Sequence, residues 1–245
     1  MKKLIVGLLG AALLAGCGGS DKDALKMVTE ATFPPYEFLR GQEIVGIDVE
    51  ICRAVAAKVG KGFKVESVNF DAVIPSVISG KADLAAAGIT ITEDRKKNVD
   101  FSIPYVKTGV VIIYKKSKPY LTGAACKGKK VGVQGGTTAD EYVVKTLGQE
   151  PERFPSFAEG VAALKNGRCD LVMCDIVPAR NCIKGESDLA LSDFVTSEEY
   201  AIAIRKGQPE LLKAVNETIV ELRKNGTLDK WVDAYTAEAD KLKEK

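Results

Sequence analysis

The sequence predicts an α/β protein made of two related lobes that two strand-like segments connect. Two observations support this prediction: an internal repeat of a helix followed by a short apolar strand, and two apolar runs, 109–116 and 200–206, suited to crossing between the lobes. The chain of 245 residues is long enough for two small lobes, and its 46% hydrophobic and 28% charged residues are typical of a globular protein.

The repeat pairs residues 70–84 (FDAVIPSVISGKADL) with residues 157–171 (FAEGVAALKNGRCDL), aligned without gaps. In both copies an apolar-periodic helix ends at a glycine, Gly80 or Gly167, as a left-handed helix C-cap requires. A basic residue, one other residue and Asp-Leu then lead into a short apolar strand. Seven similar positions in one frame indicate two related α/β lobes.

The remaining elements complete two lobes. We expect strands at 26–31, 84–89, 129–133 and 171–174. We expect a helix at 48–58 closed by Gly60, a helix capped by Thr92, a helix from Pro209 and a last helix with Trp231. A further helix is entered through Gly135-Gly136-Thr137-Thr138, with Glu141 at capping-box spacing from Thr138. Because the chain crosses out and back, we expect lobe 1 to comprise 26–112 and 203–245, and lobe 2 to comprise 113–202. Hinged closure over a ligand is the expected motion.

The N-terminus indicates export. Two lysines precede an apolar run at 4–15 that is too short to span a bilayer, which takes about 20 helical residues. We therefore expect residues 1–16 to be a signal peptide. The peptide ends in LAGC, which resembles the bacterial lipobox, so we expect Cys17 to carry a lipid and residues 17–25 to form a tether to the outer face of the cell membrane. An ordinary secretory peptide with a chance cysteine is the alternative.

Composition narrows the function further. The formal charge is +2, from 35 basic and 33 acidic residues, and no basic run carries interleaved aromatics, so we expect no nucleic-acid partner. The chain has no histidine, which removes the Ser-His and Cys-His routes to an activated nucleophile. We expect no cofactor and no metal site, because histidine and a Cys-x-x-Cys motif are both missing.

Five cysteines follow Cys17, an odd number that cannot pair fully within one chain. They are Cys52, Cys126, Cys169, Cys174 and Cys182. Cys52 lies in an apolar helical pattern and is expected to be a buried small hydrophobe. One disulfide within 169–182 is left open.

The candidate ligand-binding residues follow the two repeat strands, where open α/β sheets bind ligands. In the first lobe the loop from Gly88 through Thr90 brings Arg95 to a helix start, where a guanidinium and free backbone donors can hold a carboxylate. In the second lobe Asp175 directly follows the strand. A zwitterion satisfies a cation in one lobe and an anion in the other, so the pair predicts an α-amino acid. An exposed arginine and a capping aspartate are the alternatives.

Aromatic and polar residues near the first strand suggest where a ligand side chain would lie. Two prolines stiffen the segment that presents Phe33 for stacking. Phe70 either stacks on the ligand or packs within its lobe, as Phe157 would in the other copy. Glu30, three residues before Phe33, either receives a cationic or amide side chain or points to solvent, and Gln134 could add a polar contact.

The glycine-rich turn before Thr138 has free backbone amides, which suit a carboxylate. It lacks the lysine of a P-loop and the glycine spacing of a dinucleotide-binding turn. Thr137 and Thr138 are therefore candidate ligand contacts, although Thr138 could merely cap the helix that follows.

Four segments carry a resemblance to the bacterial extracellular solute-binding family 3. They are TEATFPPYEF, GITITEDRKKNVDFSIPY, VGVQGGTT and NGTLDKW, and the resemblance covers residues 26–235. It implies a type II periplasmic-binding-protein fold with a two-strand hinge. It also implies a monomeric polar amino-acid receptor that serves an ABC importer, with a permease and its ATPase as partners.

The resemblance also implies roles for individual residues. Carried over by position, four groups would hold the ligand carboxylate: Arg95, the Gly88 backbone, Thr90 and Thr138. Asp175 would hold the ammonium group, and Phe33 and Phe70 would flank the side chain. Glutamine receptors of this family have histidine where this chain has Cys174, which weakens a glutamine-only assignment.

Other functions stay open at this point, although we expect no enzyme. Some proteins similar to this fold are exported dehydratases of aromatic amino-acid precursors, in which case Glu30 would act as acid or base. A sensor domain for a separate receptor chain is a third possibility. For a receptor, Glu30 favours arginine, lysine or ornithine, then glutamine, because a leucine would leave that carboxylate dehydrated and unpaired. In the competing interpretation Glu30 points to solvent and Cys174 shapes a smaller pocket for a neutral ligand.

Overall fold

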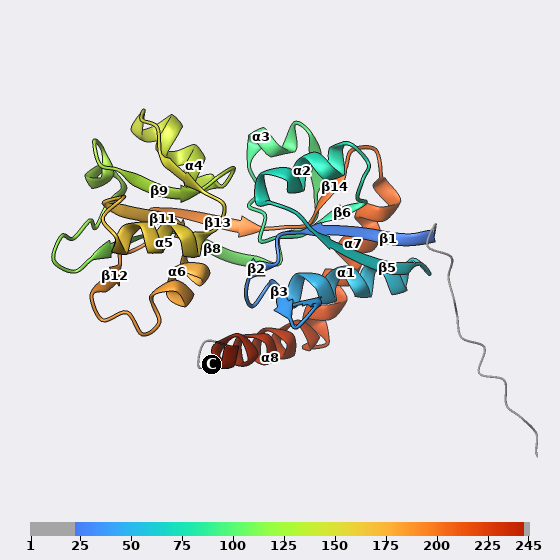
Figure 1. Ribbon diagram of the computed structural model, residues 1–245. Helices are drawn as coiled ribbons and strands as arrows, with labels where there is room; N and C mark the ends of the chain where they lie inside the picture. Colours follow the sequence, from blue (N-terminus) through green and yellow to red (C-terminus); the bar gives the residue numbers. More distant parts are fainter. Residues whose placement is uncertain (1–22, 243–245) are drawn as a thin grey trace, which may run out of the picture.

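Two β-sheets, each with helices on both faces, form two lobes that lie side by side (Figure 1). The structure is a computed structural model that describes residues 23–242, so the predicted signal peptide and Cys17 lie outside the described residues. The predicted α/β class and two-lobed arrangement are confirmed. Within the described range, no helix combines the length and the apolar character needed to cross a bilayer.

The first lobe is built on a five-stranded sheet with the order β5-β1-β6-β14-β7. Its strands are β1 (Ala24–Thr29), β5 (Gly62–Ser67), β6 (Leu84–Ala85), β7 (Val99–Phe101) and β14 (Ala203–Arg205). Its helices are α1 (Ile47–Lys58), α2 (Phe70–Ile78), α3 (Glu93–Lys96), α7 (Pro209–Lys224) and α8 (Thr227–Leu242). A small sheet of β2 (Thr32–Phe33), β3 (Glu37–Arg40) and β4 (Glu43–Val45) connects β1 to α1. The helix α2 covers one face of the large sheet, and α1 with α7 covers the other (Figure 1).

The second lobe is built on a six-stranded sheet with the order β10-β9-β11-β8-β12, in which β13 also pairs with β8. Its strands are β8 (Val106–Lys115), β9 (Val131–Gln134), β10 (Glu152–Phe154), β11 (Leu171–Asp175), β12 (Leu189–Leu191) and β13 (Thr196–Tyr200). Its helices are α4 (Thr138–Tyr142), α5 (Phe157–Lys165) and α6 (Ile176–Ile183), with a 3₁₀ turn at Gly123–Cys126 and a π-helical turn at Val143–Leu147.

The internal repeat corresponds to α2-β6 in the first lobe and α5-β11 in the second. Gly80 and Gly167 have φ angles of 74° and 76°, the left-handed conformation expected of both. The repeated aspartates have equivalent partners. Asp83 accepts the N–H of Lys26 at 2.9 Å, and Asp170 accepts the N–H of Lys130 at 3.0 Å. In each lobe the aspartate thus ties the end of the repeat helix to the start of a central parallel strand.

The chain passes between the sheets twice, through residues 102–105 and 201–202, and these two segments bond to each other. The Ser102 N–H donates to the Ile202 carbonyl at 2.9 Å, and the Ile202 N–H donates to the Ser102 hydroxyl at 3.0 Å. The Tyr105 N–H donates to the Tyr200 carbonyl at 2.9 Å. This is the two-strand hinge that the resemblance implied.

Several element boundaries differ from the prediction. The predicted lobe boundary at 112/113 lies inside β8, which pairs along its length with strands of the second sheet. The predicted strand at 200–206 is two strands, β13 and β14, because the chain leaves one sheet after Tyr200 and joins the other at Ala203. The predicted strand at 84–89 pairs only at Leu84–Ala85, and residues beyond it bend into the cavity between the lobes.

Three cysteines of the second lobe, Cys126, Cys169 and Cys174, are thiols in the core. Cys169 and Cys174 are buried and not disulfide-bonded, so the bridge left open within 169–182 is not formed. Cys52 is buried in α1, as its apolar pattern predicted. Burial raises the pKa of the Cys174 thiol well above its usual range.

Candidate ligand-binding site

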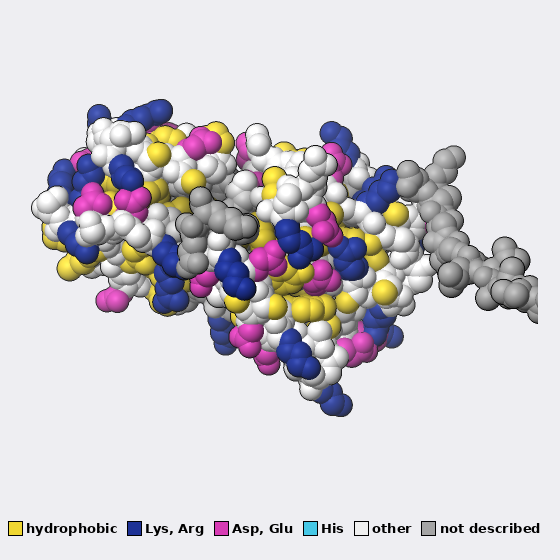
Figure 2. Space-filling view, turned by 60° about the horizontal axis from the view of Figure 1, so that its bottom comes forward, with side chains coloured by type: hydrophobic (Ala, Val, Ile, Leu, Met, Phe, Trp, Pro, Cys, Tyr) yellow, Lys and Arg dark blue, Asp and Glu magenta, His cyan; other side chains and the backbone are white. Residues whose placement is uncertain are grey.

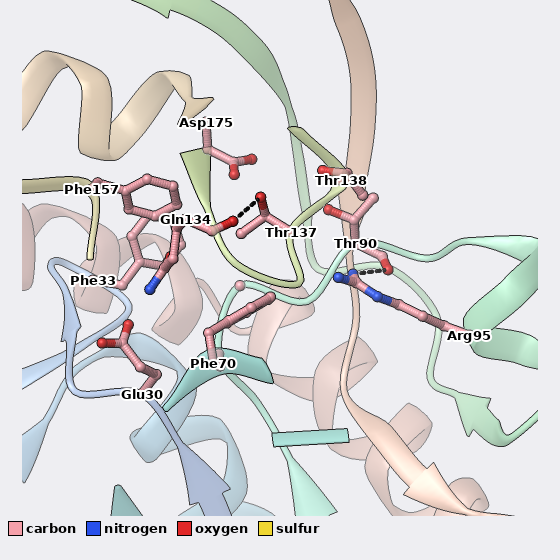
Figure 3. A pocket seen from close by; sticks show the side chains of 12 residues that line it. Glu30, Phe33, Phe70, Thr90, Arg95, Gln134, Thr137, Thr138, Phe157 and Asp175 are labelled. Atoms are coloured by element: carbon pink, nitrogen blue, oxygen red, sulfur yellow. Dashed lines mark hydrogen bonds between the residues drawn. The ribbon is translucent and has the colours of Figure 1, made fainter. Parts of the chain in front are cut away.

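A cavity lies between the lobes, at the carboxyl ends of the parallel strands. All ten ligand-binding residues predicted from the sequence line it. They are Glu30, Phe33, Phe70, Gly88, Thr90, Arg95, Gln134, Thr137, Thr138 and Asp175. Ala87 and Phe157 also line it and were not among the predicted residues. The two ends of the cavity differ: Arg95, Thr90 and Thr138 lie at one end, and Glu30 lies at the other beside Phe33 (Figure 3).

Arg95 spans both lobes. Its Nη1 donates to the Thr90 carbonyl at 2.8 Å, and its Nη2 donates to the Gly136 carbonyl of the second lobe at 3.1 Å. Thr92 caps α3 as predicted, since its hydroxyl accepts the Arg95 N–H at 3.2 Å. A guanidinium has five N–H donors, so it retains donors for a carboxylate. Burial lowers the pKa of Arg95, and nearby carboxylates oppose this shift, among which Glu198 is the largest influence.

Asp175 lies at the end of β11 with 7% of its surface exposed. The Tyr200 hydroxyl donates to its Oδ1 at 2.6 Å. Burial, reinforced by the charge of Glu198, raises the pKa of Asp175 to about 7, while the Tyr200 bond and the Arg95 charge act in the opposite direction. A cationic partner stabilises the ionised form of such a buried carboxylate, because the attraction of an ammonium group offsets the free-energy cost of removing the charge from water.

Thr90 is buried at the base of the cavity. Its hydroxyl donates to Glu198 Oε2 at 2.6 Å. This bond uses the single proton of the hydroxyl, so Thr90 could donate to a ligand carboxylate only through its backbone N–H. The implied role of Thr90 as a carboxylate contact is therefore restricted to its main chain in this arrangement.

Gly88 lets an aromatic ring approach the backbone. It has a φ of 55°, and a Cβ atom there would lie 2.3 Å from Cε1 of Phe33. Only glycine combines that conformation with that contact. The Gly88 N–H donates to Asp48 Oδ2 at 3.1 Å, so this amide is already bonded and is not the donor for a ligand carboxylate that the resemblance implied. Its carbonyl oxygen is the Gly88 group that could contact a ligand, as an acceptor.

Three phenylalanine rings surround the middle of the cavity. Phe33 and Phe157, from different lobes, have ring centroids 6.1 Å apart. Phe70 lies across from this pair (Figure 3), and the Arg95 guanidinium carbon lies 5.7 Å from its ring centroid. Phe70 and Phe157 both line the cavity and both also pack against the apolar clusters around them, so each ring has a packing role beside its place in the cavity wall. The repeat itself was the signal for Phe157, because it aligns with Phe70.

Glu30 is 92% buried at the far end of the cavity, with 8% exposed, so it does not point to solvent. The Thr32 hydroxyl donates to its Oε1 at 2.6 Å. Burial raises the pKa of Glu30, and hydrogen bonds from Thr32 and Gln134 oppose that shift. Gln134 is buried beside it, and its Nε2 donates to the Pro155 carbonyl at 2.9 Å.

The start of α4 corrects the predicted cap. Thr137, rather than Thr138, is the N-cap: its hydroxyl accepts the Asp140 N–H at 3.2 Å and donates to the Gln134 carbonyl at 2.9 Å. The capping box predicted for Thr138 and Glu141 is therefore wrong by one position. This shift releases the Thr138 side chain, which faces the cavity at the first position of the helix.

Cys174 does not line the cavity. It precedes Asp175 on β11, where alternation points the two side chains to opposite faces, and it is fully buried in the core. The competing interpretation, in which Cys174 shapes a smaller pocket, therefore has no support from its position.

Contacts at the rims hold the lobes together around the cavity. Asn181 Nδ2 donates to the Pro34 carbonyl at 2.8 Å, and Lys184 lies 2.8 Å from Asp240 of α8. On another rim, Lys145 of the second lobe pairs with Asp94 of the first. On the face that shows α8, charged side chains of both signs are interspersed (Figure 2). The structure is thus in a closed arrangement.

The chain matches the bacterial extracellular solute-binding proteins, family 3, over residues 25–238. It is 35% identical over 261 residues to a Neisseria gonorrhoeae protein named "Probable histidine-binding protein", covering 97% of this chain and 96% of the relative. It is 31% identical over 246 residues to "ABC transporter arginine-binding protein 1" of Escherichia coli strain K12, covering 96% of this chain and 99% of the relative. The crystal structure of a mutant of ArgBP from T. maritima aligns with a TM-score of 0.82 at 38% identity, covering 88% of this chain and 96% of that one.

These relatives are solute-binding proteins and not enzymes, so the dehydratase alternative gains no support. They span nearly the whole chain, and the structural neighbour shares its two-lobed fold. The sequence match, the two-lobed fold and the position of the cavity between the lobes all indicate the same family. The chain belongs to family 3 of the bacterial extracellular solute-binding proteins.

Proposed function

We propose that this protein is a lipid-anchored receptor that captures L-arginine, or a similar cationic L-amino acid, and delivers it to an ABC transporter. The observation that carries this proposal is the arrangement of charges around the cavity: Arg95 lies at one end, within electrostatic reach of Asp175, and a separate buried carboxylate, Glu30, lies at the other end. An amino-acid zwitterion uses the first end, which leaves Glu30 to pair with a charged side chain.

The zwitterion would be held from both lobes. The Arg95 guanidinium and the backbone N–H groups of Thr90 and Thr138 would bind the carboxylate, in keeping with the anion affinity of a helix N-terminus. Asp175 and the Gly88 carbonyl would bind the ammonium group. Because the contacts come from different lobes, a bound ligand would stabilise the closed arrangement over an open one.

The side chain would lie among the three phenylalanine rings and end at Glu30. With Arg95 paired to the ligand carboxylate and Asp175 to the ammonium group, one buried negative charge remains in the cavity, that of Glu30. A cationic tip neutralises it, whereas an acidic side chain would add a like charge and an aliphatic one would leave it unpaired. A guanidinium also gains cation–π contacts from the rings, so arginine should bind more tightly than lysine or ornithine, with glutamine next. The name of one relative, arginine-binding, agrees with the first place in this order, whereas the name of the other, histidine-binding, refers to an amino acid that the order does not rank.

Calorimetry with arginine, lysine, ornithine, histidine, citrulline and glutamine tests this proposal. Citrulline is the critical control because it has the shape of arginine without the charge. We expect wild type to bind arginine more tightly than citrulline. Glu30→Gln should reduce that preference about tenfold or more, because a desolvated charge pair contributes at least about 1.4 kcal/mol to binding. Arg95→Ala should weaken every amino acid in the panel. A neutral amino acid that binds most tightly, with no effect of Glu30→Gln, would exclude a cationic ligand.

The membrane anchor is a separate part of the proposal, and its support is the lipobox-like segment LAGC at 14–17. Mass spectrometry of the mature N-terminus should find a lipid on Cys17. Cys17→Ser should release protein that still binds its ligand, because the first described strand, β1, begins at Ala24, beyond Cys17. A wild-type protein that leaves the cell without a lipid would contradict the anchor and would not affect the proposal for the ligand.

A further inference from the structure

The strand β13 forms a layer behind the cavity. Its side chains alternate between buried and exposed: Glu198 and Tyr200 are buried, with 8% and 0% of their surfaces exposed, while Ser197 and Glu199 are exposed. The strand pairs with β8 of the second sheet and ends at the hinge. Two adjacent glutamates therefore have opposite surroundings, and only Glu198 is directed toward the site.

Glu198 accepts a hydrogen bond on each of its carboxylate oxygens. Oε2 accepts the hydroxyl of Thr90, from the other lobe, at 2.6 Å, and Oε1 accepts the hydroxyl of Thr196 at 3.3 Å. Two residues along the same face of the strand, the Tyr200 hydroxyl donates to Asp175 Oδ1 at 2.6 Å. Thr90 and Asp175 both line the cavity, whereas Glu198 and Tyr200 lie behind them.

A hydroxyl has one proton and two lone pairs. Because the Thr90 hydroxyl donates its single proton in the hydrogen bond to Glu198, the Thr90 oxygen can only accept a hydrogen bond from a ligand. When Tyr200 occupies one oxygen of Asp175, the second oxygen is left as an acceptor. Both arrangements present acceptors near Asp175, and the α-ammonium group is the donor that every amino acid carries.

We infer that Glu198 and Tyr200 are positioning residues for the ligand ammonium group: Glu198 makes the Thr90 hydroxyl an acceptor, and Tyr200 orients the Asp175 carboxylate. The inference rests on the proposed function, because it requires an α-amino acid in this cavity. It changes the expected role of the Thr90 side chain from carboxylate contact to ammonium contact. It also assigns a reason for the buried acidic residue on β13, which lines no part of the cavity.

The test compares Glu198→Gln with Glu199→Gln, which makes the same charge change one residue away on the exposed face. We expect Glu198→Gln to weaken arginine binding about tenfold, as loss of a charged acceptor does, and Glu199→Gln to change it less than about twofold. Thermal unfolding of the unliganded proteins checks that both variants fold.

A double-mutant cycle with Thr90→Val separates this mechanism from a packing or long-range charge effect. If Glu198 acts through the Thr90 hydroxyl, Glu198→Gln should cost less than about twofold in the Thr90→Val background. A loss that is the same size with and without the hydroxyl would overturn the inference for Glu198. A wild type that binds arginine, with Glu198→Gln equal to Glu199→Gln, would also overturn it while leaving the proposed function intact. A wild type that binds no amino acid would remove both.

Tyr200→Phe provides a second, independent variant if Glu198→Gln does not fold. Asp175 is faced by Tyr200 and Glu198 from β13, by Arg95 from α3 and by Tyr36 from the segment after β2. Removing the Tyr200 hydroxyl deletes a bond that favours the charged form of Asp175. The acid limb of the arginine-binding profile should therefore move to higher pH. An unchanged profile would refute the role of Tyr200, since a merely structural residue would alter stability without moving the midpoint.

Discussion

Lowering the pH from 8 to 5 should weaken amino-acid binding about 90-fold through one residue, Asp175. Its carboxyl group is buried, and burial raises its pKa from the ordinary value of 3.8 to about 7. The neutral carboxylic acid cannot balance the charge of an ammonium group. Protons therefore compete with the ligand, and affinity falls as the pH drops below the raised pKa.

The size of the effect follows from the fraction of unliganded molecules with an ionised Asp175. With a pKa of about 7, about nine in ten molecules carry the carboxylate at pH 8, and about one in a hundred does so at pH 5. The ratio is about 90-fold, which corresponds to about 2.7 kcal/mol. Binding at pH 6 should release about 0.9 proton per ligand, because the bound state requires the ionised form.

Isothermal titration calorimetry can measure both quantities. Arginine is titrated at pH 5 to 8, and at pH 6 in two buffers that differ in ionisation enthalpy, which counts the protons released. The measurement is made in the Glu30→Gln background, because burial raises the pKa of Glu30 as well and its protonation would add to the effect for a cationic ligand. Asp175→Asn should bind weakly at every pH and show a flat profile. Affinity that stays constant from pH 5 to 8, or a slope that persists in Asp175→Asn, would refute the reasoning.

Three further predictions concern packing, stability and closure. Gly88→Ala should lower the unfolding free energy and the ligand affinity more than Gly60→Ala does. Both positions have a positive φ, but only a Cβ at Gly88 meets the Phe33 ring. Equal losses of unfolding free energy in chemical denaturation would contradict this. Asp48 is fully buried and burial raises its pKa to about 6, so it contributes stability that is present below about pH 4 and lost as the pH rises through 6. The unfolding free energy of Asp48→Asn should therefore rise relative to that of wild type as the pH increases from about 4 to 7, and parallel pH curves would count against the assignment. Lys145→Ala should weaken ligand binding by less than about fivefold, and the effect should disappear in about 1 M salt, because its ion pair across the rim is exposed; a larger, salt-independent loss would indicate another role.

Short-range patterns were sufficient for the repeat and its helix ends. A glycine that ends a helix and an aspartate that precedes a strand act within a few residues, so Gly80 and Gly167 could be interpreted from their neighbours alone. Thr92 was predicted correctly as a cap for the same reason. The cap of α4 was displaced to Thr137, because the point at which the chain turns into a helix depends on the preceding glycines and on Asp140, whose carboxylate accepts the Gly136 N–H at 3.1 Å.

The candidate site was predicted to a large extent, and the residues that were missed share a physical cause. The resemblance and the strand-end rule supplied ten residues that line one cavity. Phe157 could have been added from its alignment with Phe70. Nothing in the linear sequence separates Glu198 from Glu199, because which of them faces the site depends on how β13 registers against β8.

The sequence by itself determined the two related lobes, the family and the charged groups that follow each repeat strand. Only the tertiary structure decided which atoms of those groups are available. The Gly88 amide is bonded to Asp48, and the Thr90 hydroxyl is bonded to Glu198. The reason is that side chains alternate along a strand with a period of two, so a shift of one residue in the register of β13 would exchange Glu198 for Glu199. That register is set by pairing with residues about 90 positions away in the chain, at Val106–Val110, and no local pattern contains it.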